Sequence, residues 1–172
     1  MIDYLLNSNL IRDYNKLSIV SPDANGVYRA KKFADILVSK TSADIGLSLV
    51  IKEKLGYDAE KMVLVGNVEG NECIILDDIV DSATTLVLAA DELYRNGAKS
   101  VYAFATHGVL SGTAIDNLKK SNIKKIVFTN TIPINKDKIA GSDKFIVLSS
   151  ASLIAETIRR IYNNESLSEM FL

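Results

Sequence analysis

The chain has 172 residues, 48% of them hydrophobic, which suits one compact domain with a substantial core. Its 20 basic and 21 acidic residues give a net charge of −1, which argues against a nucleic-acid partner bound through its phosphates. We find no run of apolar residues near the ~20 that span a bilayer, and no leader pattern at Met1. A single cysteine, Cys73, fits a reducing compartment. We therefore expect a cytoplasmic protein without a membrane or nucleic-acid partner.

Strand-like and helix-like segments alternate along the chain. Residues 1–16 form a leading segment with a helical spacing of apolar residues, and the rest, residues 17–172, forms the main domain. Short β-rich runs are expected, in chain order, at residues 17–20, 47–51, 62–65, 73–76, 101–106, 126–129 and 145–148. Apolar residues at helical spacing predict helices at residues 27–37, at 86–93 before the Asn96-Gly97 stop, and at 151–161. Continuous apolar strands alternating with helices predict the α/β class, with a mainly parallel sheet flanked by helices.

The segment that follows the fourth predicted strand is the most informative in the chain. The strand ends at two carboxylates, Asp77 and Asp78. A turn then opens a helix, and it carries a third carboxylate, Asp81, and the hydroxyl groups of Ser82, Thr84 and Thr85. Backbone N–H groups at a helix start favour a phosphate, and carboxylates suit sugar hydroxyls or a hydrated divalent cation. Asp81 or Ser82 could simply cap the helix, but capping does not explain two further carboxylates at a strand end. The segment therefore predicts a site for a phosphorylated sugar.

Residues 77–85 closely resemble the phosphoribosyl-pyrophosphate motif that type I phosphoribosyltransferases share with ribose-phosphate pyrophosphokinases. The other blocks resemble the pyrophosphokinases in their order, and they are residues 21–30, 62–66, 105–112, 129–133 and 155–161. The resemblance covers nearly the whole chain and implies the carboxyl-terminal half of such an enzyme, with a phosphoribosyltransferase-like fold. The amino-terminal domain of the family is expected to be absent, and residues 1–16 resemble the family's linker helix.

The resemblance implies an activity and its site. Family enzymes use Mg²⁺ and transfer the pyrophosphoryl group of ATP to the C1 hydroxyl of ribose 5-phosphate, which releases AMP. By matching positions, Asp77 and Asp78 are expected at the ribose hydroxyls, and the five residues Asp81, Ser82, Ala83, Thr84 and Thr85 at the 5-phosphate. The turn Asp23, Ala24, Asn25 and Gly26 resembles the pyrophosphate loop, where the aspartate helps to hold the metal. Taken alone, Asp23 would be read as a turn cap.

Further roles follow from the same resemblance. Lys52 and Lys54 match two basic residues of the family's mobile catalytic loop, although an isolated Lys-Glu-Lys is usually a solvated loop. Ser166 and Ser168 resemble a region that contributes to an allosteric phosphate site, with an exposed tail as the plain alternative. His107, the single histidine, is expected to support the site rather than bind metal. The assemblies of the family imply a homo-oligomer or association with a full-length synthetase.

Three substitutions set this chain apart from the family pattern. Thr84 stands where glycine is usual; glycine tolerates a positive φ and lets the backbone approach phosphate closely, so a β-branched residue is expected to be strained there and to weaken binding of ribose 5-phosphate. Lys54 stands where the family has an arginine, so a compact ammonium charge replaces a planar guanidinium that can donate two parallel hydrogen bonds. Asn25 stands where glycine is common, and asparagine tolerates the left-handed region. These changes leave a non-catalytic, regulatory relative open as an alternative, whereas a small phosphoribosyltransferase fits the later blocks poorly.

Overall fold

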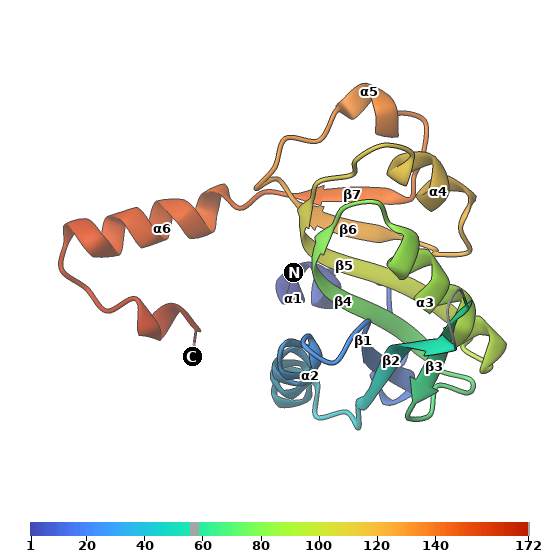
Figure 1. Cartoon of the computed structure of the whole chain (residues 1–172). Helices are drawn as coiled ribbons and strands as arrows, with labels where there is room; N and C mark the ends of the chain where they lie inside the picture. Colours follow the sequence, from blue (N-terminus) through green and yellow to red (C-terminus); the bar gives the residue numbers. More distant parts are fainter. Residues whose placement is uncertain (56–58, 172) are drawn as a thin grey trace.

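The computed structural model describes residues 1–55 and 59–171, without the side chains of residues 54, 55, 59, 60 and 171. Within this part the core is a seven-stranded sheet in the order β3-β2-β1-β4-β5-β6-β7 (Figure 1). The strands are β1 (Leu17–Ser21), β2 (Gly46–Leu55), β3 (Ala59–Val65), β4 (Glu72–Val80), β5 (Ser100–Gly108), β6 (Ile126–Thr129) and β7 (Phe145–Leu148). Neighbouring strands are parallel except β2 and β3, which pair antiparallel. The predicted class and all the predicted strands are confirmed.

Helices cover the two faces of the sheet. One face packs on α1 (Ile2–Asn7) and α2 (Val27–Thr41), and the other on α3 (Thr84–Arg95), α4 (Ala114–Lys120) and the short α5 (Lys136–Ile139). Successive side chains of β4 point to opposite faces of the sheet and so contribute to the hydrophobic core on each face. Ile74 lies on the α2 side and Ile75 on the α3 side. Turns of 3₁₀ helix span Tyr14–Lys16 and Ser168–Phe171. The predicted helices at residues 27–37 and 86–93 are confirmed.

The last helix, α6 (Ala151–Tyr162), forms as its spacing predicts but packs differently from the others. It projects away from the sheet together with the segment after it (Figure 1). Its apolar side chains Leu153, Ile154, Ile158 and Ile161 are 50% to 61% exposed. The sheet is flanked by helices as predicted, but this helix is not one of those that cover it.

The strand order creates the crevice that positions the site. The chain leaves β1 through α2 toward one edge of the sheet, and it leaves β4 through α3 toward the other edge. Since β1 and β4 are parallel neighbours, with Ser18 beside Cys73, the loops after them diverge from adjacent points. Such a reversal of strand order is the usual place for a ligand in an open α/β sheet.

Candidate functional site

A cleft of about 280 Å³ lies at the carboxyl ends of β1 and β4. Its walls come from the turn after β1 and from the segment that joins β4 to α3, which are far apart in the sequence. The lining residues are Pro22, Asp23, Asp77, Asp78, Ile79, Val80, Asp81, Ser82, Ala83, Thr85 and Leu86. Seven of the sequence-predicted site residues are among them: Asp23, Asp77, Asp78, Asp81, Ser82, Ala83 and Thr85. The fold therefore joins the predicted pyrophosphate turn, residues 23–26, to the segment expected at the 5-phosphate, residues 81–85, called here the ribose-phosphate loop.

The turn after β1 is held by its own polar groups. The Gly26 amide donates to Oδ1 of Asp23 at 2.8 Å, and Oγ of Ser21 donates to the Asp23 carbonyl at 2.7 Å. A Cβ on Gly26 would lie 2.6 Å from Oγ of Ser21, so the turn needs glycine there for space. Asn25 does not have a positive φ, so the tolerance of asparagine for the left-handed region is not needed at this position. Asp23 caps the turn, as its plain reading suggested, and it also lines the cleft.

Asp77 and Asp78 share an arginine from α2. Nη2 of Arg29 lies 2.7 Å from Oδ2 of Asp78, and Nη1 lies 3.8 Å from Oδ1 of Asp77. The Asp78 amide also donates to Oδ1 of Asp77 at 2.8 Å. The sequence reasoning gave Arg29 no role, although a basic residue in the first turn of a helix opposes the helix dipole and so indicates a partner elsewhere. The arginine fixes the carboxylate pair at the mouth of the cleft.

The two carboxyl groups have pKa values that move in opposite directions. Burial, with smaller contributions from the Asp78 and Asp23 charges, raises the pKa of Asp77 to about 6. Burial opposes ionisation of Asp78 too, but its hydrogen bond with Asp77 and the Arg29 charge together lower its pKa. At neutral pH the pair therefore offers a firmly ionised carboxylate beside one that is less acidic than usual.

The loop into α3 leaves the helix start without a side-chain cap. The cap residue is Ala83, and the nearest hydroxyl, Oγ of Ser82, is 3.5 Å from the Thr84 amide, at the limit of a hydrogen bond. Amide groups at the start of α3 therefore remain available to an anion, which is what a phosphate site requires and simple capping does not.

The strain expected at Thr84 lies one residue earlier. Ala83 has φ +63°, whereas Thr84 begins the helix and does not have a positive φ. The prediction that a β-branched residue is strained at position 84 is therefore wrong. Thr84 also lines a different groove, between α3 and α4, together with Asn117 and Lys120.

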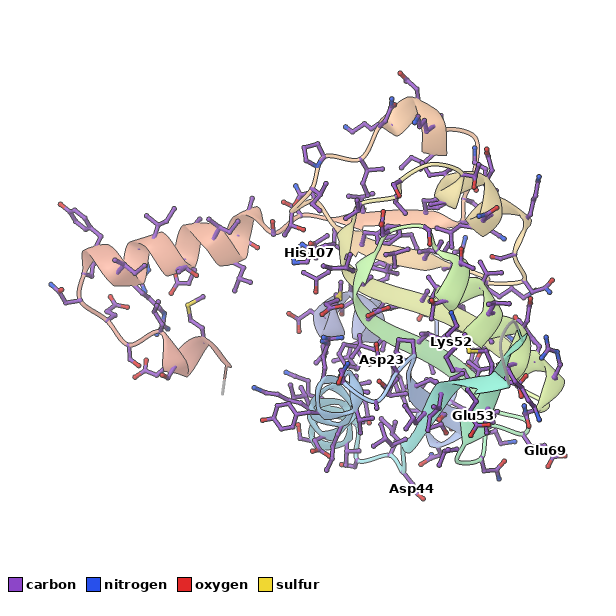
Figure 2. All side chains as sticks on the ribbon, in the orientation of Figure 1. Asp23, Asp44, Lys52, Glu53, Glu69 and His107 are labelled. Carbon is purple, nitrogen blue, oxygen red and sulfur yellow. The ribbon has the colours of Figure 1, made fainter. Side chains whose placement is uncertain are left out.

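The predicted catalytic lysines lie on a strand. Residues 52–55 continue β2 and pair with β3, with Lys52 opposite Met62 and Lys54 opposite Glu60. The β-rich run predicted at residues 47–51 thus extends to Leu55, and the loop expected around these two lysines is wrong for residues 52–55. Lys52 lines a small hollow with Leu88 and Arg95 beside α3, and it is not among the residues that line the carboxylate cleft. Figure 2 labels Lys52 and, from the turn after β1, Asp23. The side chain of Lys54 lies outside the described residues.

The remaining candidates lie at other places. His107, near the end of β5, makes a 2.8 Å hydrogen bond through Nδ1 with Oγ1 of Thr131. Ser166 and Ser168 are exposed on the projecting segment after α6, where the Ser166 carbonyl accepts from Arg160 at 2.6 Å. Ser111 lies in the family-like block 105–112, but the sequence analysis gave it no role; its hydroxyl donates to Oδ1 of Asp81. No local pattern reveals this contact, because it joins segments 30 residues apart.

Comparisons with known proteins agree on one family. A family model described as the phosphoribosyl synthetase-associated domain matches residues 28–172. Ribose-phosphate pyrophosphokinase 3 of Saccharomyces cerevisiae is 44% identical over 160 residues, which cover 92% of this chain and 48% of that protein. Ribose-phosphate pyrophosphokinase of Bacillus cereus is 42% identical over 177 residues, which cover 99% of this chain and 53% of that protein. The chain spans about half the length of the curated relatives it matches.

A solved structure supports the same grouping. The crystal structure of phosphoribosylpyrophosphate synthetase from Mycobacterium smegmatis superposes with a TM-score of 0.78 at 35% identity. The match covers 94% of this chain and 50% of that one. None of the helices in the described part of the chain is long and apolar enough to cross a membrane.

Proposed function

Because the chain belongs to the phosphoribosyl synthetase-associated domain family, we propose that it is the ribose-phosphate-binding domain of a ribose-phosphate pyrophosphokinase. The proposed reaction joins the C1 hydroxyl oxygen of ribose 5-phosphate to the β-phosphorus of ATP. The bond from that phosphorus to the oxygen bridging the α- and β-phosphates breaks, the hydroxyl proton is lost, and AMP leaves with phosphoribosyl pyrophosphate as the other product. About half the length of the relatives lies outside this match, and we assign it most of the adenine contacts.

The observation that carries the proposal is the cleft that joins a carboxylate pair to an uncapped helix start. Asp77 and Asp78 present acceptors that suit sugar hydroxyls, and the amides at the start of α3 suit the 5-phosphate. Asp23 approaches the same cleft from the neighbouring strand. A sugar phosphate bound between these groups would present its C1 side toward the Asp23 turn, where the pyrophosphoryl group is proposed to lie.

The donor set of the cleft fits Mg²⁺. All the charged ligands available are carboxylates, which are the oxygen donors that a hard cation prefers. Within the described residues no three acidic, histidine or cysteine side chains are placed to hold an ion together. Mg²⁺ typically keeps several waters and binds through one or two carboxylates plus substrate phosphates, so Asp23 with Asp77 is a sufficient protein contribution. Bound there, Mg²⁺ would neutralise charge that develops on the transferring phosphates.

The chain's own residues would mainly position the reactants. Arg29 holds Asp78 ionised, which keeps a strong acceptor in place for a ribose hydroxyl. The turn from Asp23 to Gly26 would face the β- and γ-phosphates. We assign Lys52 and Lys54 to the transferring phosphates by resemblance alone, and we propose that the protein works as an oligomer or with a full-length synthetase. Ser166 and Ser168 are proposed for an allosteric phosphate site.

One observation favours a second candidate, a non-catalytic relative that binds ribose 5-phosphate and regulates a synthetase. Lys52 lines a hollow beside α3 rather than the carboxylate cleft. Phosphoryl transfer needs cations around the developing charge. A cleft without this lysine would therefore bind the sugar phosphate but catalyse the transfer poorly. Activity and binding therefore have to be measured separately.

Isothermal titration of ribose 5-phosphate in the presence of Mg²⁺ tests the binding site. We expect saturable binding that is weakened about tenfold or more by Asp78→Ala, because a charged hydrogen-bond acceptor is lost. Asp143→Ala removes an exposed carboxylate that pairs with Lys125 just before the amino ends of β6 and β7, whereas the cleft lies at carboxyl ends of strands, so this variant should bind normally. Absence of binding by the unchanged chain would contradict the proposal.

Chromatographic detection of AMP tests the chemistry. The chain is incubated with ATP, ribose 5-phosphate and Mg²⁺, alone and mixed with a full-length synthetase carrying an inactivated site. AMP above the controls in either mixture supports the pyrophosphokinase. Binding of ribose 5-phosphate without AMP in any mixture supports the regulatory relative.

A further inference from the structure

The segment between β5 and α4, residues 109–113, lies against the start of the ribose-phosphate loop. The amides of Val109 and Leu110 both donate to the carbonyl of Val80, at 3.0 and 3.1 Å. The hydroxyl of Ser111 donates to Oδ1 of Asp81, the next residue along the loop. One neighbouring segment therefore holds both the backbone entry and the first acidic side chain of this loop.

The backbone that presents Ser111 is itself fixed. The Ala114 amide donates to the Ser111 carbonyl at 3.0 Å, which ties the serine to the start of α4. Leu110 is buried and has φ +54°, a left-handed conformation that leucine adopts only when its surroundings impose it. Ala83, two residues after Asp81 in the ribose-phosphate loop, is also buried and left-handed. Two strained non-glycine residues thus flank the contact between Ser111 and Asp81.

The hydrogen bond between Ser111 and Asp81 bears on the electrostatics of the cleft. Asp81 is exposed and lines the cleft in which the proposed function puts the 5-phosphate of the sugar. Without a hydrogen-bond partner, the Asp81 carboxylate would repel the phosphate. Its side chain would also lose rotamer freedom when the ligand binds. A hydroxyl that donates to its carboxylate fixes the rotamer beforehand and draws negative charge toward the serine.

We propose that Ser111 is a positioning residue of the ribose-phosphate site, which acts through Asp81 to order the loop before the ligand binds. The inference rests on the proposed function, because it takes the cleft to be the ribose 5-phosphate site. It adds a residue from a third strand connection to a site otherwise built from the segments after β1 and β4.

Isothermal titration with ribose 5-phosphate and Mg²⁺ compares the full chain with three variants. We expect Ser111→Ala to weaken binding about tenfold, since a hydrogen bond to a charged group is lost. Ser111→Thr keeps the hydroxyl on an exposed side chain and should bind within about twofold of the unchanged chain. Ser39→Ala removes another exposed serine hydrogen bond, at the far end of α2, and should leave binding unchanged.

Thermal unfolding separates positioning from a general structural role. The midpoint of Ser111→Ala should lie within about 3 °C of the unchanged chain, because one exposed hydrogen bond adds little stability. A large fall in the midpoint that tracks the loss of affinity would overturn the positioning role. Should the alanine variant fail to fold, Ser111→Cys replaces it in the comparison, because a thiol is a poor donor of similar size.

A double-mutant cycle tests the route through Asp81. Asp81→Ala removes the acceptor, so adding Ser111→Ala to it should change the affinity by less than about twofold. An equal loss in both backgrounds would show that Ser111 acts on the ligand by another path, and would overturn the inference. Equal affinities of Ser111→Ala and the unchanged chain would overturn it while leaving the proposed function intact. If the unchanged chain binds no ribose 5-phosphate, the proposed function fails and the inference falls with it.

Discussion

Asp77 and Asp78 are neighbours in the chain, yet their carboxyl groups differ in acidity because their surroundings differ. Asp78 is more than half exposed and pairs with Arg29, whereas the Asp77 side chain is 22% exposed. The sequence predicts two equivalent ligands for the ribose hydroxyls. The structure gives them different electrostatic roles, with Asp78 a permanent anion and Asp77 sensitive to pH near 6.

Replacement of Asp77 by asparagine should change how stability depends on pH. Its pKa rises from 3.8 to about 6 on folding, so its ionisation costs the folded state stability as pH rises through that window. Asp77→Asn cannot ionise and should be more stable than the unchanged chain by about 1 to 2 kcal/mol at pH 7.5, with no difference near pH 3.5. Urea unfolding at the two pH values measures this. A gain of the same size at both pH values would contradict the pKa shift, and Asp143→Asn should show no gain.

The space at Gly26 gives a second prediction at this scale. Gly26→Ala keeps an allowed backbone, with φ −78°, but places Cβ 2.6 Å from Oγ of Ser21. Because Ser21 is buried and hydrogen-bonded, we expect a loss of about 1 to 2 kcal/mol in the free energy of unfolding. In a Ser21→Ala background the same change should cost less than about half as much. An undiminished cost there would show that the clash involves another group.

At the scale of elements, periodicity predicts which segments form but not what covers them. The stripe on α3 is buried, with Leu93 fully inaccessible, whereas the equally clear stripe on α6 is exposed. The β2–β3 hairpin makes the same point, because its strands continue past Ile51 through pairing that local apolar runs do not reveal. Cross-strand partners, rather than local sequence, place Lys52 on a strand.

The difference between the two helices is measurable. Ile158→Ala on α6 should change the free energy of unfolding by less than about 0.5 kcal/mol, because the side chain is 61% exposed. Leu93→Ala on α3 should lower it by about 2 to 4 kcal/mol, since a buried side chain leaves a cavity. Urea denaturation followed by circular dichroism compares the two. A loss above about 1 kcal/mol for Ile158→Ala would mean that α6 is covered in solution.

At the scale of the whole molecule, the leading segment shares the core of the main domain. Leu5 of α1 is fully buried against the side of the sheet that carries Ile19, Ile74 and Phe104. The hydroxyl of Tyr14 donates to the Leu5 carbonyl at 3.2 Å, and this hydrogen bond links the 3₁₀ turn to α1. The sequence analysis assigned residues 1–16 to a linker helix and residues 17–172 to the main domain. The linker role of residues 1–16 stays a prediction.

Shared burial predicts that α1 and the sheet unfold together. Leu5→Ala should lower the free energy of unfolding of the whole chain by about 2 to 4 kcal/mol, because it opens a cavity in the common core. Circular dichroism and tyrosine fluorescence should report one coincident urea transition. Leu47→Ala, at a 40% exposed position on β2, is the matched control and should have a small effect. An unchanged midpoint for Leu5→Ala would show that the segment is loosely attached.

The sequence by itself determined the strands, three of the helices and the position of the ribose-phosphate loop. These depend on local apolar spacing and turn chemistry, which neighbouring residues set. Tertiary structure decided what depends on distant pairing: Asp23 in the same cleft as Asp77, Arg29 on Asp78, Ser111 on Asp81, and Lys52 outside that cleft. It also moved the strained position from Thr84 to Ala83, because α3 begins at Thr84 and its cap residue Ala83 has the positive φ. Contacts between segments many residues apart leave no periodic trace in the chain, so only the folded arrangement reveals them.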